Sequence, residues 1–163
     1  MQAIQCYDTV SQVPRKVDLA VVAVPANGVP DVVRECGESG VNACVIVSAG
    51  FKEVCAEGKK LEDHVLSIAK SYYLRVLGPN CLGFSRPSHH VNATFAHIMP
   101  EPGNVAFLSQ SGALGTAMLD WAMGNHIGFS AFVSVGSMSD VDFGDLIDYF
   151  GMDPKTHSII LYV

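Results

Sequence analysis

Residues 107–115, Phe-Leu-Ser-Gln-Ser-Gly-Ala-Leu-Gly, decide the fold of this chain. The apolar run Val105–Leu108 predicts a strand, and the Ser/Gly turn after it predicts the start of a helix. A strand-to-helix junction of this kind directs backbone N–H groups and hydroxyls at one point, which is how many folds bind a phosphate group. We therefore expect phosphate-binding residues in this turn, namely Ser109, Gln110, Ser111, Gly112 and Ala113.

Two other interpretations of the same turn need to be weighed. A serine hydrolase would need glycine two positions before and two positions after its nucleophile, but Ser111 has Ser109 and Ala113 there, so this class is disfavoured. Simple capping is the second alternative, in which Ser109 or Ser111 accepts one backbone hydrogen bond and no ligand binds. The segment alone does not decide between capping and phosphate binding.

Strands and helices alternate along the whole chain. Apolar runs predict strands at 17–24, 41–47, 73–77, 105–108, 129–135 and 158–163. Helical spacing predicts helices from Pro30 to Gly37 and at 61–72, 113–125 and 141–150, with Ser139 and Asp142 in capping-box spacing before the last. The third helix is expected to bury Leu114, Ala117, Met118, Trp121 and Ala122. This alternation predicts an α/β fold with parallel sheets and right-handed crossovers.

The polar stretch between the two halves is rich in Gly, Pro, Ser, Asn and His. We interpret residues 78–103 as the connection between two domains together with an extended surface segment. Each half then supplies three strands, whereas doubly wound nucleotide-binding domains usually have five or six. Val163 also ends what looks like a buried strand. We therefore expect two partial three-layer parallel-sheet domains that belong to a larger protein.

Composition and charge exclude several classes of function. Hydrophobic residues make up 49% of the chain, no apolar run reaches the roughly 20 residues that a bilayer crossing needs, and Met1–Gln5 does not resemble a signal peptide. No Lys or Arg lies between Arg86 and Lys155, so neither nucleic acid nor a membrane is an expected partner. The five cysteines, Cys6, Cys36, Cys44, Cys55 and Cys81, form no Cys-x-x-Cys pair, which favours the cytoplasm and no zinc site.

Four motifs in order resemble one family over nearly the whole chain. They are Val-Asp-Leu-Ala-Val-Val-Ala-Val-Pro-Ala (17–26), Val-Ser-Ala-Gly-Phe-Lys-Glu (47–53), Leu-Gly-Pro-Asn-Cys-Leu-Gly (77–83) and Phe-Leu-Ser-Gln-Ser-Gly-Ala-Leu (107–114). Together they resemble the NDP-forming acyl-CoA synthetases, which are related to the α-subunit of succinyl-CoA synthetase. Residues 128–138 and 145–149 are most similar to bacterial acetate–CoA ligase-like proteins, which often carry a fused acetyltransferase domain.

The resemblance implies a division of the chain and a set of CoA contacts. Residues 1–80 would be the C-terminal part of a Rossmann-like CoA-binding domain, and residues 81–163 the N-terminal part of a flavodoxin-like, succinyl-CoA-ligase-like domain. Ligands of open parallel sheets lie outside the carboxyl ends of the strands. The CoA-binding residues implied there are Pro25, Ala26, Asn27, Ser48, Ala49, Gly50, Phe51, Asn80 and Cys81.

The family reaction converts acyl-CoA, phosphate and ADP into the free acid, CoA and ATP through an acyl phosphate and a phosphohistidine. The resemblance places the phosphorylated histidine beyond Val163 and the glycine-rich CoA loop before residue 1. It assigns ADP or ATP and Mg to an ATP-grasp domain or subunit. The expected ligands of this chain are thus CoA, phosphate, and a small carboxylic acid or its acyl phosphate, in a homo- or hetero-oligomer. No catalytic residue and no metal ligand are assigned, and the chain alone is expected to be inactive.

Several residues and functions remain as alternatives. The six histidines, His64, His89, His90, His97, His126 and His157, lie outside the expected motif and are interpreted as structural or surface residues. Cys81 could be a nucleophile, although a contact near the thiol end of CoA is favoured. The alternative function is a non-catalytic acyl-CoA-sensing module of a protein lysine acetyltransferase. A stand-alone serine or cysteine hydrolase is the third candidate.

Overall fold

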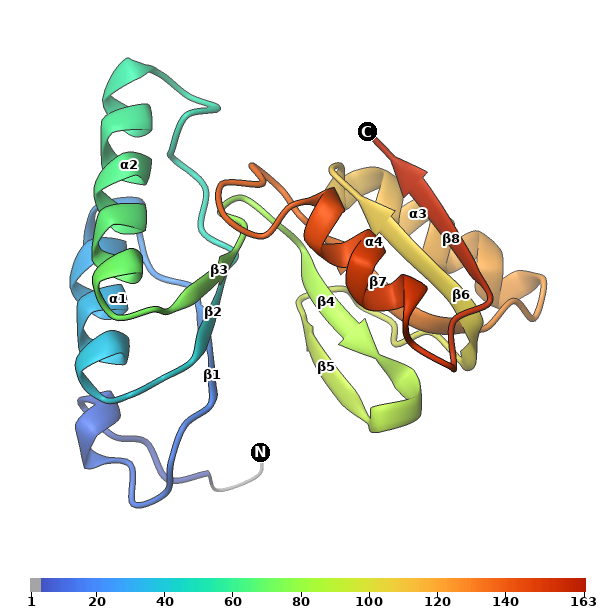
Figure 1. The fold of residues 1–163 in the computed structure, drawn as a ribbon, viewed down its shortest axis with the longest axis horizontal. Helices are drawn as coiled ribbons and strands as arrows, with labels where there is room; N and C mark the ends of the chain where they lie inside the picture. The colour runs from blue at the N-terminus through green and yellow to red at the C-terminus, as the bar shows by residue number, and fades with distance from the viewer. Residues whose placement is uncertain (1–3) are drawn as a thin grey trace.

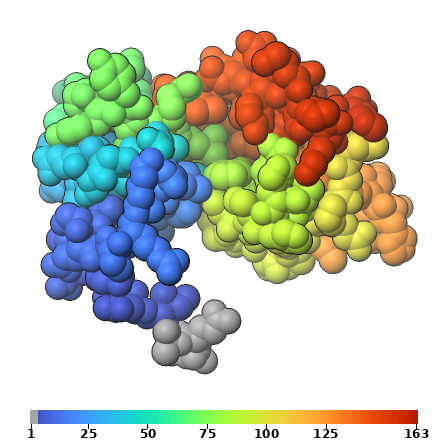
Figure 2. Space-filling view, turned by 60° about the horizontal axis from the view of Figure 1, so that its bottom comes forward, coloured from blue at the N-terminus to red at the C-terminus, as the bar shows by residue number. Residues whose placement is uncertain are grey.

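The structure is a computed structural model that describes residues 4–163. Residues 1–3, which begin the predicted first domain and the segment compared with signal peptides, lie outside the described residues. The chain forms two halves that lie side by side, each built on its own sheet (Figures 1 and 2). None of the helices in residues 4–163 is both long enough and apolar enough to cross a bilayer.

The first half is a parallel sheet with two helices on one face (Figure 1). Its elements are η1 (Val10–Gln12), β1 (Leu19–Val22), η2 (Ala26–Gly28), α1 (Val29–Glu38), β2 (Ala43–Ile46), α2 (Ala56–Ser71) and β3 (Arg75–Leu77). The strand order is β1-β2-β3. Val22, Cys44 and Val76 face the helices and belong to the first core. Val45 and Leu77 belong instead to a core shared with the second half.

The second half is a mixed sheet covered on both faces. Its elements are β4 (Gly83–Arg86), η3 (Pro87–His89), β5 (Val91–Thr94), β6 (Pro102–Ser109), α3 (Gly112–Gly124), β7 (Phe129–Ser134), α4 (Phe143–Gly151) and β8 (Ser158–Tyr162). The strand order is β5-β4-β7-β6-β8, with β6 parallel to β7 and β8. Ala106 and Leu108 pack with α4, while Phe107 packs with α3, so the two helices lie on opposite faces (Figure 1).

The α/β class and the order of the strands and helices are confirmed, but the connection between the halves was interpreted wrongly. Residues 83–94 form an antiparallel hairpin, and its strand β4 pairs antiparallel with β7. The second sheet is therefore mixed rather than parallel throughout, and it has more strands than the three expected. The side chains of β4 alternate, with Phe84 partly exposed and Ser85 buried, because successive side chains of a strand point to opposite faces of the sheet.

The expected buried face of α3 is also partly wrong. Leu119 and Ala122 are buried, but Trp121, the single tryptophan, is 56% exposed and Ala117 is exposed. Because α3 is apolar on nearly every side, the spacing of its apolar residues does not single out one face.

The loop between β7 and α4 joins the two halves. The backbone N–H groups of Ser137, Ser139 and Val141 donate to the carbonyls of Pro79, Gly78 and Val76 at 2.8, 3.2 and 3.1 Å. The loop thereby continues hydrogen bonding along the free edge of β3, and in Figure 1 it lies beside that strand. At Gly136, a Cβ atom would lie only 2.3 Å from the Pro79 carbonyl oxygen, so this close approach requires glycine.

An acidic pair on the loop and α4 reinforces this joint. Arg75 donates from Nε to Asp140 at 3.0 Å and from a terminal nitrogen to Asp145 at 2.7 Å. Asp140, and then Asp145, raise the pKa of Arg75. Asp140 also accepts the Val76 N–H at 2.7 Å. The first and second halves are thus connected by both backbone and side-chain bonds.

A second ion pair connects the hairpin to the segment that follows α4. Arg86 donates to the Ser130 carbonyl, to the Tyr149 hydroxyl and to Asp153 at 3.0, 3.1 and 2.6 Å. The side chains of Arg86 and Asp153 are each only 11% exposed. The Lys155 N–H, and then the Arg86 charge, lower the pKa of Asp153.

We predict that Arg86→Met lowers the free energy of unfolding by about 3 kcal/mol, because it leaves the Asp153 carboxylate buried without its partner. Denaturant unfolding at neutral pH measures this loss. Arg86→Lys is the matched control, since it keeps the charge without the planar fork, and it should be intermediate.

The same pair predicts a pH dependence. A lowered folded-state pKa contributes stability above the ordinary pKa of aspartate, and this contribution is lost as the pH falls through the lowered value. Wild type should therefore lose more stability than Arg86→Met on acidification. Equal losses would contradict the assignment.

Candidate functional site

The turn before α3 leaves backbone donors at the start of the helix. Ser111 is the N-cap, and its Oγ accepts the Leu114 N–H at 3.2 Å. Ser109 Oγ accepts the Ser111 N–H at 3.1 Å. The two hydroxyls therefore shape the turn, as the capping alternative expected. The N–H groups of Gly112 and Ala113, the first in α3, have no intrahelical acceptor by position.

This turn borders a pocket. A cavity of about 440 Å³ is lined by Asn80 and Cys81, which follow β3, and by Gln110, Ser111, Gly112 and Ala113. Val47, Leu82, Phe95 and Thr116 complete its lining. The structure therefore brings the predicted phosphate turn together with two of the predicted CoA residues. Both groups follow the carboxyl ends of parallel strands, where ligands of open sheets bind.

Asn80 and Cys81 have different environments in this pocket. Asn80 is exposed, has a left-handed backbone with φ 54°, and donates its N–H to the Ser48 carbonyl at 2.9 Å. Cys81 is buried, and its Sγ donates to the Ile46 carbonyl at 3.4 Å. Burial raises the pKa of the Cys81 thiol to about 11. A neutral buried thiol is a poor nucleophile, which argues against the cysteine-hydrolase alternative.

The other predicted CoA residues lie along the carboxyl ends of β1 and β2. Pro25 and Asn27 are exposed, and Ala26 is half-buried. Asn27 and Gly50 line a separate cavity of about 470 Å³ against the start of α2.

On the loop after β2, Ala49 is exposed, while Ser48 Oγ donates to the Val24 carbonyl at 2.5 Å. Phe51 is fully buried in the first core, so its side chain is part of the packing.

Sequence analysis missed several residues of this region. A cavity of about 500 Å³ shares Asn80 and Gln110 with the pocket above and adds Lys52, Glu53, Gly136, Ser137 and Met138. Partial burial raises the pKa of Glu53, but the hydrogen bonds that its carboxylate accepts from the Gly50 and Phe51 N–H groups lower it. Lys52 and Glu53 belong to the motif at 47–53, so the sequence could have indicated them as site residues. Phe95 carried no signal, since it lies in the stretch interpreted as a surface segment.

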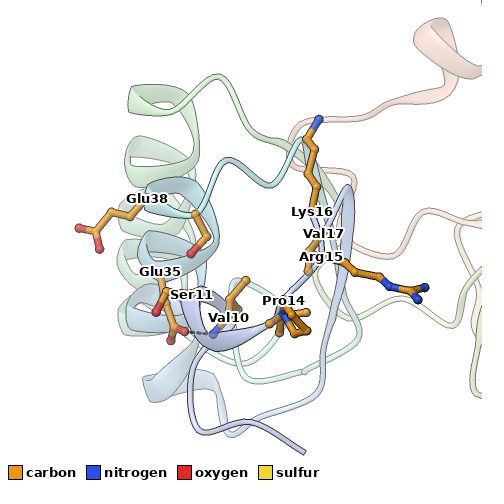
Figure 3. A pocket seen from close by; sticks show the side chains of 10 residues that line it. Val10, Ser11, Pro14, Arg15, Lys16, Val17, Glu35 and Glu38 are labelled. Atoms are coloured by element: carbon orange, nitrogen blue, oxygen red, sulfur yellow. Dashed lines mark hydrogen bonds between the residues drawn. The ribbon is translucent and has the colours of Figure 1, made fainter. Parts of the chain in front are cut away.

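One further cavity lies away from these strand ends. It has a volume of about 570 Å³ and is formed by the segment before β1 and the C-terminal part of α1, with Arg15, Lys16, Glu35 and Glu38 in its lining (Figure 3). A hydrogen bond from the Val10 N–H to Glu35 crosses it. The amino ends of the strands meet there, so this cavity is not at the edge where a ligand is expected.

Comparison with known proteins agrees with this arrangement. The profile described as "CoA binding domain" matches residues 1–87, more than half of the chain, and the profile "Succinyl-CoA ligase like flavodoxin domain" matches residues 102–163. The chain belongs to the NDP-forming acyl-CoA synthetase family. Its two halves are the Rossmann-like and flavodoxin-like domains expected of such synthetases.

Relatives within this family match nearly the whole chain. Acetate–CoA ligase (ADP-forming) I of Archaeoglobus fulgidus is 44% identical over 97% of the chain, and the alpha subunit of acetate–CoA ligase (ADP-forming) II of Pyrococcus furiosus is 43% identical over 100%. The chain spans 23% and 35% of these relatives.

A solved structure of acetyl-coenzyme A synthetase 1 from Ca. Korarchaeum cryptofilum, in complex with phosphate and ADP, has a TM-score of 0.95 and 44% identity. The match covers 100% of this chain and 35% of the Korarchaeum chain.

We predict that Cys81 resists alkylation at pH 8, because its thiol is buried and remains protonated there. Iodoacetamide should modify the exposed Cys6 and Cys55 first, with Cys81 reacting only after denaturation. Peptide mass spectrometry over a time course measures the order. Modification of Cys81 as fast as Cys55 would contradict the buried environment.

Proposed function

We propose that this chain is the CoA- and phosphate-binding portion of an ADP-forming acyl-CoA synthetase that acts on acetate or a similar small acid. The observation that supports this most is the cavity shared by Asn80 and Cys81 with the turn at Ser111–Ala113. Residues predicted to bind CoA and residues predicted to bind an anion line this one cavity, which supports the proposal. The division of the chain after Asn80 into the two domains is part of the proposal.

In the proposed reaction, a phosphate oxygen attacks the thioester carbonyl carbon, the C–S bond breaks, and CoA leaves as acyl phosphate forms. The N–H groups of Gly112 and Ala113 would hold the phosphate at the positive end of the α3 dipole. Fixed donors of this kind stabilise charge without reorganisation. The free thiol end of CoA would lie beside Asn80 and Cys81. Pro25, Ala26, Asn27, Ser48, Ala49, Gly50 and the backbone of Phe51 would line the path of CoA.

Further partners belong to the proposal as well. The Pyrococcus relative is an alpha subunit, and the Korarchaeum structure contains phosphate and ADP. We infer that this chain works with an ATP-grasp domain or subunit that binds ADP or ATP with Mg, in a homo- or hetero-oligomer. A cytoplasmic location goes with it, because the free thiols of Cys36, Cys44 and Cys81 suit a reducing compartment. The relatives named above are ligases and do not support the acetyltransferase-linked regulatory alternative.

We predict that Gly112→Asp weakens phosphate binding at least about tenfold, because it places a negative charge beside the bound anion. The side chain should fit, since a Cβ at this position would lie 3.5 Å from Leu82 Cβ. An acidic residue in the first turn also favours the helix, so the melting temperature should not fall. Phosphate titration followed by NMR of the Gly112 and Ala113 amides, or calorimetry, measures the affinity.

Gly112→Asn is the matched control, because it has the same shape without the charge. It should lose less affinity than Gly112→Asp. If both variants bind phosphate as wild type does, the turn is not the phosphate site.

A further inference from the structure

Lys52 holds an unusual position among the charged residues. It lies in the loop between β2 and α2, its side chain is 38% exposed, and it lines the cavity that includes Asn80 and Gln110. Among the residues that line this cavity and the neighbouring pocket at the start of α3, Lys52 is the only Lys or Arg. An anion that enters there meets this ammonium group, whose charge is partly offset by Glu62 at 3.2 Å.

The Lys52 ammonium is oriented by two fixed acceptors. Its Nζ donates to the Ser137 carbonyl at 2.7 Å and lies 3.2 Å from Glu62 Oε1. A lysine ammonium has three N–H donors, so one remains for a ligand in the cavity. The acceptors come from α2 and from the loop after β7, which means that both halves of the chain set the position of this charge.

Glu62 is the residue that makes the arrangement rigid. It is 2% exposed. Its carboxylate also accepts hydrogen bonds from the Ser139 hydroxyl and, at 3.4 Å, from the backbone N–H of Lys52. A buried carboxylate requires a positive partner and hydrogen bonds. The Ser139 hydroxyl therefore hydrogen-bonds to this carboxylate and does not cap α4. The capping box of α4 is formed by Asp142 and Asp145, not by the predicted pair Ser139 and Asp142.

The other charged side chain in the lining of this cavity belongs to Glu53, and it forms its hydrogen bonds within its own turn. The Glu53 carboxylate accepts the Gly50 and Phe51 N–H groups at 2.6 and 3.1 Å, which directs it to its own turn. Asn80 and Gln110, both exposed, add amide donors at the border of the two cavities. The lining thus combines Lys52, neutral amide donors and one carboxylate that is hydrogen-bonded within its own turn, which suits a small oxyanion better than a polyanion.

We propose that Lys52, positioned by Glu62, binds a small substrate oxyanion in this cavity, beside the phosphate turn and separate from it. The ligand chemistry is a phosphate or carboxylate group. The inference rests on the proposed function for its reaction. Asn80 and Gln110 line both this cavity and the pocket at the start of α3, so the two anion sites would border each other.

The test uses this chain and two probes, inorganic phosphate and acetate, in NMR titrations of the Lys52 ammonium nitrogen. We expect one of them to shift that signal together with the side-chain amides of Asn80 and Gln110. A response to phosphate identifies a phosphoryl ligand, and a response to acetate identifies a carboxylate. If neither probe moves the Lys52 signal, the proposal is wrong.

Variants separate binding from folding. Lys52→Met alone would leave Glu62 uncompensated, so it is combined with Glu62→Gln, which removes both charges and keeps the sizes similar. This double variant should bind the responding anion about tenfold more weakly, as expected for loss of a charge-assisted hydrogen bond. Lys59→Met is the control, since Lys59 pairs only with Asp63 on the exposed side of α2. An equal loss in the control would overturn the proposal.

Glu62→Gln alone tests the positioning role. It retains the Lys52 charge and a hydrogen-bond acceptor but weakens the orientation. Because it also removes a negative charge beside Lys52, which alone would strengthen anion binding, an affinity between wild type and the double variant shows that orientation dominates, and a rise above wild type contradicts the positioning role. The Gly112 and Ala113 amides distinguish the two proposals. If phosphate shifts them without moving Lys52, only the phosphate turn stands, and the converse leaves only the Lys52 site.

Discussion

The hydrogen bonds between the loop after β7 and the free edge of β3 determine where the two sheets meet. Ser137, Ser139 and Val141 use backbone N–H groups for this, so the joint depends on main-chain geometry more than on side-chain identity. Buried amides and carbonyls must find partners, and these partners lie in different halves. The consequence is that the carboxyl ends of both sheets border the same cavities, and a site can be built from residues separated by thirty or more positions.

Much of the fold could be predicted because local pattern and tertiary role agree. The run at 129–135 contains β7, which is buried throughout, and the run at 17–24 contains β1, which pairs parallel with β2 although Val21 is 50% exposed. The hairpin at 83–94 was not predicted, because each of its strands has only four residues and because Gly83 and Pro87 suggest a loop. The exposure of Trp121 was not predicted for a different reason. A helix that is apolar on nearly every side carries no periodic signal for which side meets the sheet.

The site could be predicted only in part. Residues that follow strand ends, such as Asn80 and Ser111, are located by topology, because parallel strands place their carboxyl ends at one edge. The burial of Cys81 and the partners of Lys52 depend on how two distant halves pack, and no single segment encodes this. Ser137 and Ser139 lie close to Lys52 and Glu62 because the loop after β7 is hydrogen-bonded to β3. The local patterns that predict single strands and helices do not reveal such a long-range contact.

The exposure of Trp121 gives the molecule a built-in optical probe. It is the single tryptophan, and it lies on α3, whose first residues belong to the turn proposed to bind phosphate. The indole emission therefore comes from one place without overlap from other indoles. Because solvent quenchers reach a half-exposed ring, shielding of this helix by another protein surface would be visible as a blue shift and reduced quenching, with no label attached.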